Sequence, residues 1–392
     1  MKLPGKTLLQ LDRCFWLPHR LAEWLRKTLG GIRKDPTHHV LVVKFMGLGS
    51  LVHFALLCER NQVDKTKIAI LTLSQHRELL ALLGFENALF IRTNNVLNFL
   101  LDCWKTISDA RRLNPSIIID FERCSHSASL FTNVLALFAR CPTISFENGR
   151  SIASSKQIVF DVNKLTQEQL FLNGIRSMAM TGTVRDNDEL VQVESSKVII
   201  NINASNYFLA RRYPISSFVD LIRLLHQWNP DLEFFLTGTA EESEYSATLA
   251  NKLPGVPIQN VSGAWNLDRL VNELSNCAVF ITGDSGPLHL AAFMQIPMIA
   301  IWGPTQPEHF GYESLPAMVN STLNLSCSPC LSHPASNPAK HCHGTINCLK
   351  NLPPSAIFQM AVSILTTHAT TRNVHPLSGR SISAQRYFHQ PA

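Results

Sequence analysis

The sequence predicts an α/β protein with two similar halves, each built around a parallel sheet. At 392 residues, the chain is longer than one compact core usually holds, so two domains are expected. Short apolar runs alternate with helical stretches, as they do in parallel sheets. Each half also opens with an apolar run that ends in a loop of small residues, 46–50 in one and 203–205 in the other. This organisation suits a cleft between two domains.

The individual strands are predicted from the apolar runs. In the first half these runs are 40–45, 68–73, 88–91 and 116–121. In the second half they are 198–202, 233–237, 258–261, 278–282 and 298–302. Residues 183–196 lose apolar periodicity and gain acidic residues, which is typical of a linker. An amphipathic helix is predicted over 355–366, after Pro353 and Pro354.

The positive charge lies at the two ends of the chain. The formal net charge is +6, and residues 1–38 contain eight basic and three acidic residues. Residues 371–392 contain three Arg and no acid, so the remaining body has a net charge of −2. A basic body suited to nucleic acid is therefore excluded. No apolar run reaches the roughly 18 residues that would span a bilayer.

The N-terminal arm, 1–38, is patterned as an amphipathic helix. One face holds Leu17, Leu21, Trp24, Leu25 and Thr28, and another holds Arg20, Glu23, Arg26 and Lys27. Two interpretations stay open: an interfacial helix on an anionic membrane, or a helix that packs its apolar stripe on the body. Polar residues and Pro18 interrupt any apolar segment of a cleavable signal peptide, which predicts a cytoplasmic location.

The most informative segment is 281–311, ITGDSGPLHLAAFMQIPMIAIWGPTQPEHFG. It combines a buried strand, a Gly-Asp-Ser-Gly turn, a helix with Pro287 in its first turn, a second strand and a Gly-Pro turn. The positive end of the helix would lie at the carboxyl edge of the sheet, where a phosphate binds. The turn at 303–305 would end at the same edge, so both loops are expected to form one ligand site.

This segment resembles the nucleotide-sugar site of family 9 glycosyltransferases, the heptosyltransferase family of lipopolysaccharide synthesis. The resemblance covers about 39–365 and implies that Asp284, Ser285, Gly286 and His289 hold the donor pyrophosphate. The segment 211–214, RRYP, resembles a Lys-x-Trp-Pro element and places Arg211 at the donor phosphates. The segment TGTAEESE places Glu242 near the donor ribose, although a Glu in the first turn of a helix needs no ligand. Ser205, in the loop that opens the second half, is counted with the donor contacts.

The resemblance implies a GT-B fold, with two Rossmann-like domains that face each other across a cleft. The expected domains are the arm 1–38, an acceptor domain 39–182, the linker 183–196 and a nucleotide-sugar-binding domain 197–352. A helix in 353–370 would return to the first domain, and 371–392 would be a disordered tail.

The implied reaction is an inverting transfer of a sugar from a nucleotide donor, ADP-heptose in this family, to a lipopolysaccharide core or other envelope glycan. It would need no cofactor or catalytic metal and would take place at the inner face of the cytoplasmic membrane. Two alternatives stay open: a family member that uses another nucleotide sugar, and a non-catalytic nucleotide-sugar-binding protein of envelope assembly.

One position departs from the family pattern. Several family members have Asp after the glycine in the first loop, as the proposed base, and this chain has Ser50. A serine hydroxyl has no proton affinity near neutral pH, so another group must act. The candidates are His53, one turn beyond Ser50, and the acids Asp120 and Glu122 after a strand. Glu122 is favoured because it lies beyond the strand end, and a structural role is the alternative for each.

The ten cysteines do not predict a disulfide framework in a cytoplasmic chain. Four of them are clustered: Cys327, Cys330, Cys342 and Cys348. Four cysteines can form a tetrahedral zinc site, but the five-residue spacing of the second pair is loose for a zinc ribbon. A metal site and a metal-free cysteine-rich loop therefore both remain open.

Overall fold

The computed structural model divides the chain into two compact units, with the boundary between residues 184 and 185. The described residues are 22, 25, 37–45, 47–122, 126–147, 156–159, 169, 171, 172, 175, 189–191, 195–204, 209–310, 312, 315, 317–323, 325–330, 346–367 and 372–374. Most of the predicted arm 1–38 therefore lies outside the described residues. Ser205 also lies outside them. Among the described residues, no helix combines the length and hydropathy needed to cross a bilayer.

The first unit contains a six-stranded parallel sheet in the order β3-β2-β1-β4-β5-β6. Its strands are β1 (Thr37–Val43), β2 (Ile68–Leu73), β3 (Asn87–Ile91), β4 (Pro115–Asp120), β5 (Thr143–Glu147) and β6 (Lys156–Val159). The central strands consist of Val, Ile and Leu that are buried on both faces, because helices cover both faces of the sheet.

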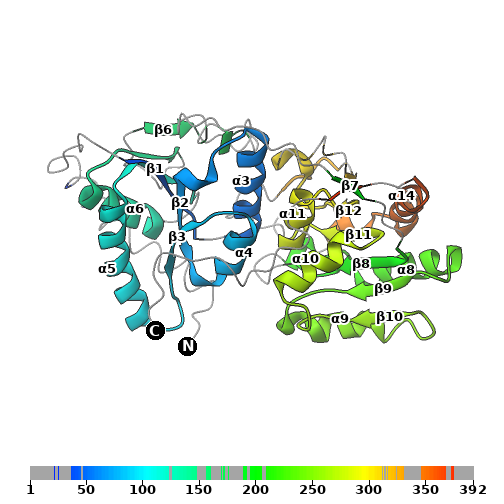
Figure 1. The fold of residues 1–392 in the computed structure, drawn as a ribbon. Helices are drawn as coiled ribbons and strands as arrows, with labels where there is room; N and C mark the ends of the chain where they lie inside the picture. Colours follow the sequence, from blue (N-terminus) through cyan, green and yellow to red (C-terminus); the bar gives the residue numbers. More distant parts are fainter. Residues whose placement is uncertain are drawn as a thin grey trace. The chain divides into compact units, whose positions relative to one another are not determined.

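Figure 1 shows α3 (Leu48–Arg60) and α4 (Arg77–Leu82) on one face of this sheet and α5 (Val96–Leu113) and α6 (His126–Ala139) on the other. Leu41 and Val43 of β1 pack in one cluster with Ala110 of α5 and Leu135 of α6. On the other face, Phe54 of α3 contacts the rings of Phe85, Phe121 and Phe171.

The second unit repeats this topology with the order β10-β9-β8-β11-β12-β13 (Figure 1). Its strands are β8 (Lys197–Asn201), β9 (Glu233–Leu236), β10 (Ile258–Asn260), β11 (Val279–Gly283), β12 (Met298–Ile301) and β13 (Met318–Ser321). Its helices are α8 (Ile215–Trp228), α9 (Ser243–Ala250), α10 (Leu267–Ser275), α11 (Gly286–Phe293), α13 (Asn347–Lys350) and α14 (Pro354–Thr367). The prediction of two parallel α/β sheets is confirmed, and all nine predicted strands are present within a few residues.

Two features near the end of the described chain bear on the predicted domain boundaries. The predicted C-terminal helix, α14, packs in the core of the second unit, and its expected return to the first unit stays a prediction. Ile357, Ala361 and Ile364 are buried in the same apolar cluster as Ile222 and Leu225 of α8. In addition, β7 (Glu189–Val191) in the predicted linker pairs antiparallel with β14 (Arg372–Val374) in the predicted disordered tail.

Candidate active site

The loops after β8 and β11 meet where the strand order of the second sheet reverses. From β8 the chain moves outward through β9 to β10, and then returns to β11 on the other side of β8. In open α/β sheets, ligands bind outside the carboxyl ends of the two strands that flank such a reversal. Asn201 ends β8, and Asp284 and Ser285 follow β11, so these residues lie at the edge where a ligand is expected.

Ser285 is the N-cap residue of α11, but its hydroxyl does not cap the helix. Within the described part of the chain it makes no side-chain capping hydrogen bond. Instead, the hydroxyl accepts a hydrogen bond from Asn201 Nδ2 at 2.9 Å and lies 3.0 Å from Thr282 Oγ1. The first amides of an α-helix have no partner inside the helix, and the helix dipole adds positive charge there. α11 therefore presents a positive end to an anion at this edge.

Asp284 gathers three side chains from distant segments around one buried carboxylate. Its Oδ2 accepts a hydrogen bond from Thr305 Oγ1 at 2.7 Å and forms an ion pair with Arg211 Nη1 at 3.1 Å. Its Oδ1 lies 3.8 Å from His289 Nε2, too far for a hydrogen bond, and accepts none from any described residue. Because a carboxylate repels a diphosphate, this geometry suits Asp284 to hold Arg211 in place rather than to touch phosphate.

His289 is a neutral ring in this site. Burial lowers its pKa to about 4, since the nearby Asp284 only partly offsets the cost of removing an imidazolium from water. The Nδ1 atom is 3.1 Å from the hydroxyl of Tyr312, and the ring of Phe310 packs edge-on at 5.2 Å. At neutral pH, His289 therefore contributes hydrogen bonding and shape rather than charge.

A segment containing two of the clustered cysteines supports the turn that carries Thr305. Ser328 Oγ donates a 2.6 Å hydrogen bond to the carbonyl of Gly303, and the amide of Cys330 donates one to Pro304 at 3.0 Å. A Cβ added at Gly303 would lie 2.5 Å from Leu349 Cγ of α13, so only glycine allows this close approach. Ser328, Cys330 and Leu349 of α13 therefore hold the turn 303–305 in place.

Three of the four cysteines that are clustered in the sequence lie in the described part of the chain. Cys327 is exposed, Cys330 is half-buried and Cys348 is buried, and Cys342 lies outside the described residues. No group of three or more His, Cys, Asp or Glu in the described part of the chain is arranged to hold a metal ion.

Glu242 lies at the carboxyl end of β9, next to the reversal point. Its Oε2 accepts a hydrogen bond from the amide of Thr239 at 2.8 Å, and the two residues form a capping box. A Cβ at Gly238 would lie 3.1 Å from the same oxygen and 2.6 Å from Asn203 Nδ2, so these groups are close neighbours. The carboxylate thus has a structural partner, and its contact with a ribose stays a prediction.

The arrangement of the second unit can be compared with known proteins. The model of glycosyltransferase family 9 (heptosyltransferase) matches residues 122–341, which is more than half of the chain. The chain belongs to glycosyltransferase family 9.

A family 9 relative, lipooligosaccharide heptosyltransferase 2 of Campylobacter jejuni, is 28% identical over 183 residues, which cover 44% of this chain and 53% of the relative. The match thus spans about half the length of this curated relative. Two solved structures from E. coli share the fold. ADP-heptose lipopolysaccharide heptosyltransferase II has 16% identity and a TM-score of 0.60, covering 84% of this chain and 98% of that one. Heptosyltransferase WaaC with ADP has 15% identity and a TM-score of 0.61, covering 83% and 99%. The predicted GT-B fold is confirmed.

The loop in which several family 9 members have Asp begins α3 of the first unit. Gly47 has a left-handed backbone, with a φ of 85°, and its carbonyl accepts the amide of Ser50 at 3.0 Å. Ser50 is half-buried in the first turn of α3. His53, one turn later, is fully buried, and its ring centroid is 5.8 Å from that of Phe171. A base must reach the acceptor, and the role of His53 at this buried position stays a prediction.

The carboxylate of Glu122 is bound by residues that follow β1 of the first unit. Its Oε1 accepts a 2.9 Å hydrogen bond from Lys44 Nζ, and its Oε2 accepts one from the amide of Phe45, also at 2.9 Å. The side chains of Glu122 and Lys44 are both buried. They join the carboxyl ends of β4 and β1, where the strand order of the first sheet reverses. The favoured base candidate is therefore part of a buried ion pair.

Asp120, at the end of β4, has a structural role, the alternative that the sequence left open. Its oxygens accept hydrogen bonds from the amide of Glu122 at 2.9 Å and from Ser129 Oγ at 3.0 Å. Burial raises its pKa to about 7. His76, whose pKa is also affected by the charges of Lys44 and Glu122, shares a 2.9 Å hydrogen bond with Thr72, and burial lowers its pKa to about 4.

Some residues of the second-unit site were not assigned roles from the sequence. Asn201 and Thr282 hold Ser285, and Tyr312 holds His289. Asn201 lies at the end of a predicted strand, next to the small-residue loop. This position is the sequence feature that could have indicated a role in the site. Tyr312 follows the motif segment without any pattern of its own. Thr305 was expected at the carboxyl edge of the second sheet, but its hydrogen bond to Asp284 was not predicted.

Proposed function

We propose that this family 9 chain transfers a heptose from ADP-heptose to a lipopolysaccharide core acceptor on the cytoplasmic side of the membrane. The observation that supports it best is the open positive end of α11 beside Arg211, at the strand reversal of the second unit. The relatives named above carry heptosyltransferase names, and one of the solved structures is named for ADP-heptose. The donor, the acceptor and the location belong to this proposal.

The proposed chemistry is a single displacement that inverts the anomeric carbon. As the bond to the sugar breaks, negative charge develops on the leaving diphosphate. The amides of Ser285 and Gly286 at the start of α11, together with Arg211, supply positive charge where this charge develops. Asp284, which accepts a hydrogen bond from Thr305, orients Arg211, and the neutral His289 ring lies 3.8 Å from the other oxygen of Asp284. No catalytic metal is required in this scheme because protein groups supply the positive charge.

For the base, we keep Glu122 as the group to test. Both of its oxygens accept strong hydrogen bonds, so proton transfer requires that its pair with Lys44 open when the acceptor binds. Glu122→Gln should then lower turnover by about 10² to 10⁴-fold with little change in ADP affinity. Ser50→Asp restores the family residue and should raise turnover if the acceptor hydroxyl lies at that loop. An unchanged turnover for Glu122→Gln would remove it as the base.

The reaction is tested by incubating the full chain with ADP-heptose and a heptose-deficient lipopolysaccharide core. Release of ADP and a heptose-sized mass increase of the core support the proposal, and proton NMR of the product reports the anomeric configuration. Turnover with another nucleotide sugar in place of ADP-heptose would instead support the alternative donor.

The non-catalytic alternative rests on a specific observation, the serine at position 50. It predicts tight binding of a nucleotide sugar without ADP release in the presence of any core acceptor. Mass spectrometry of the intact complex, followed by measurement of free ADP, separates this outcome from catalysis.

A further inference from the structure

α5 in the first unit carries its large apolar residues on the outside. Exposed fractions between 54% and 74% are found for Val96, Leu97, Leu100, Leu101 and Trp104. We call these five residues the α5 apolar face. The residues of α5 that are buried are instead Asp102, Thr106 and Ala110. A surface helix of a globular protein normally turns its apolar side inward, as α5 does with Ile107, Ala110 and Leu113 in its second half. Its first half instead exposes a second apolar side.

The five residues lie together because of their spacing. Their positions are i, i+1, i+4, i+5 and i+8, which places them on one side of the first two and a half turns. Phe99, at 42% exposed, lies outside this row. A contiguous exposed apolar surface of this kind marks an interaction site more often than scattered single residues do.

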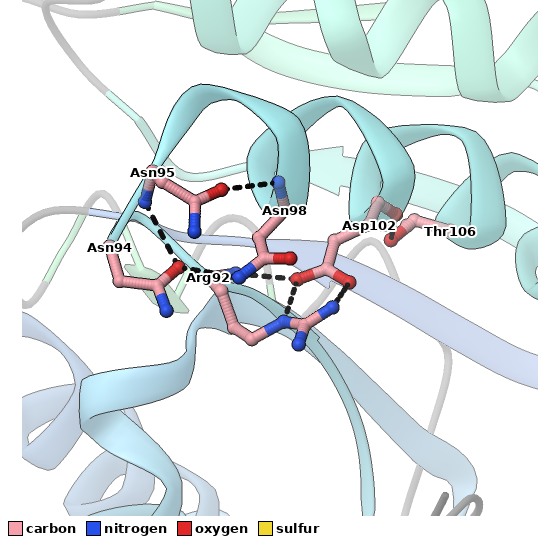
Figure 2. Close-up of polar contacts among 6 residues, drawn as sticks. All are labelled: Arg92, Asn94, Asn95, Asn98, Asp102 and Thr106. Atoms are coloured by element: carbon pink, nitrogen blue, oxygen red, sulfur yellow. Dashed lines mark hydrogen bonds and ion pairs between the residues drawn. The ribbon is translucent and has the colours of Figure 1, made fainter.

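The start of α5 is held firmly, as Figure 2 shows. Asn95 caps the helix by accepting a 2.8 Å hydrogen bond from the amide of Asn98. The guanidinium of Arg92 donates two hydrogen bonds to the carboxylate of Asp102, at 2.8 and 2.9 Å, and its amide donates a third. The Arg92 guanidinium also lowers the pKa of Asp102. The apolar face therefore stands on an ordered, capped helix rather than on a fraying end.

Basic residues lie on and beside this side of the helix: the spacing places Arg111 in line with the α5 apolar face, and Lys105 and Arg112 along its border. Lys105, Arg111 and Arg112 are exposed. The two acids of α5 point elsewhere: Asp102 is buried against Arg92, and Asp109 is half-buried with an oxygen 3.8 Å from Arg112 Nη1. All residues of α5 are described, and none of the exposed ones is acidic. The surface thus combines an apolar row with three cations.

We propose that the α5 apolar face docks the first unit on an anionic lipid bilayer, with the helix lying in the plane of the interface. Apolar side chains of an interfacial helix enter the boundary between headgroups and acyl chains, and Trp residues prefer the headgroup level. Lys105, Arg111 and Arg112 would meet the anionic headgroups. A second copy of the chain fits less well, because α5 exposes no acid to face these cations in a self-complementary contact.

This surface is separate from the donor site and is tested without donor or acceptor. The full chain is floated with vesicles of phosphatidylcholine and phosphatidylglycerol, and with vesicles of phosphatidylcholine alone. One variant combines Leu97→Gln, Leu101→Gln and Trp104→Gln, and a second combines Lys105→Gln, Arg111→Gln and Arg112→Gln. Trp228→Gln is the matched control, because Trp228 is 40% exposed on α8 of the other unit.

We expect the wild type to bind the anionic vesicles more strongly than the neutral ones, and the control to match it. The charge variant should lose binding by on the order of 10²-fold at low salt, from three cations near the surface. The apolar variant should lose roughly tenfold or more on both vesicle types. Circular dichroism and melting temperature check that the variants fold, and Trp104→Gln alone replaces the triple variant if it does not.

Three outcomes would overturn the proposal. Wild-type vesicle binding by the apolar variant would show that this face does not touch lipid. Loss of binding on deletion of 1–34, with α5 variants that bind normally, would assign the contact to the N-terminal arm. A wild-type dimer that the apolar variant dissociates, with unchanged vesicle binding, would make the face a contact between copies.

Discussion

His289 should stay uncharged when a nucleoside diphosphate binds beside it. Burial lowers its pKa to about 4 in the free protein, so the ring is neutral at pH 7. To become an imidazolium in the complex, it would need a bound anion that raises the pKa from about 4 to above 7. This requires about 4 kcal/mol of interaction with the charged ring, because each pKa unit corresponds to about 1.4 kcal/mol. The ion pair between Arg211 and Asp284 already supplies the charges of the site, so we expect no such shift.

Isothermal titration calorimetry with ADP at pH 7 measures this directly. Titrations in two buffers with different ionisation enthalpies give the number of protons taken up on binding. The wild type and His289→Asn should take up the same number, since any proton taken up by ADP itself is common to both. His226→Asn, on α8 of the same unit, is the control. If the wild type takes up about one proton more than His289→Asn, the neutral-ring argument is wrong.

Three further predictions concern stability, measured by urea denaturation. Thr305→Val removes a hydrogen bond to the buried Asp284 carboxylate, and should lower the unfolding free energy by about 1.5 to 3 kcal/mol; no loss would mean that the carboxylate finds another donor. Glu122→Gln leaves Lys44 buried without its counter-charge and should cost about 3 to 5 kcal/mol, most of which a second change, Lys44→Met, should restore; a double variant no more stable than the single would contradict this. The folded-state pKa of Asp120 is raised from 3.8 to about 7, so its contribution to stability is full at low pH and is lost as the pH rises to 7. Asp120→Asn should therefore be more stable than wild type at pH 8 and lose most of this advantage at about pH 4, near the unfolded pKa of 3.8. Equal differences at both pH values would refute the assignment.

The buried strands were predictable because their composition leaves little choice. Runs such as 68–73 contain Val, Ile and Leu without interruption, since helices cover both faces. The strands β6 and β13 were missed, and both lie at sheet edges, where polar residues such as Lys156 and Asn320 are tolerated. β5, next to an edge, was missed for the same reason: Thr143, Ser145 and Glu147 interrupt its apolar pattern.

The site was predictable where its parts are local in sequence. The turn, the helix start and His289 lie within one segment, so the pattern placed them together. The direction of Glu122 was not predictable, because it depends on Lys44, which is 78 residues away, directly after β1. The destination of α14 also depended on tertiary packing, since an amphipathic helix can cover either unit equally well in sequence terms.

The two sheets have the same strand order, but the groups at their reversal points differ in how completely the protein satisfies them. In the first unit, Lys44 and Glu122 neutralise each other. In the second, α11 lacks a side-chain cap and Asp284 Oδ1 accepts no hydrogen bond from any described residue. A nucleotide that binds to the start of α11 in the second unit stabilises the folded state of that unit alone by its binding free energy. In differential scanning calorimetry, the unfolding peak of the second unit should then move to higher temperature as nucleotide is added, while that of the first unit stays in place. The shift would identify the unit that binds the nucleotide.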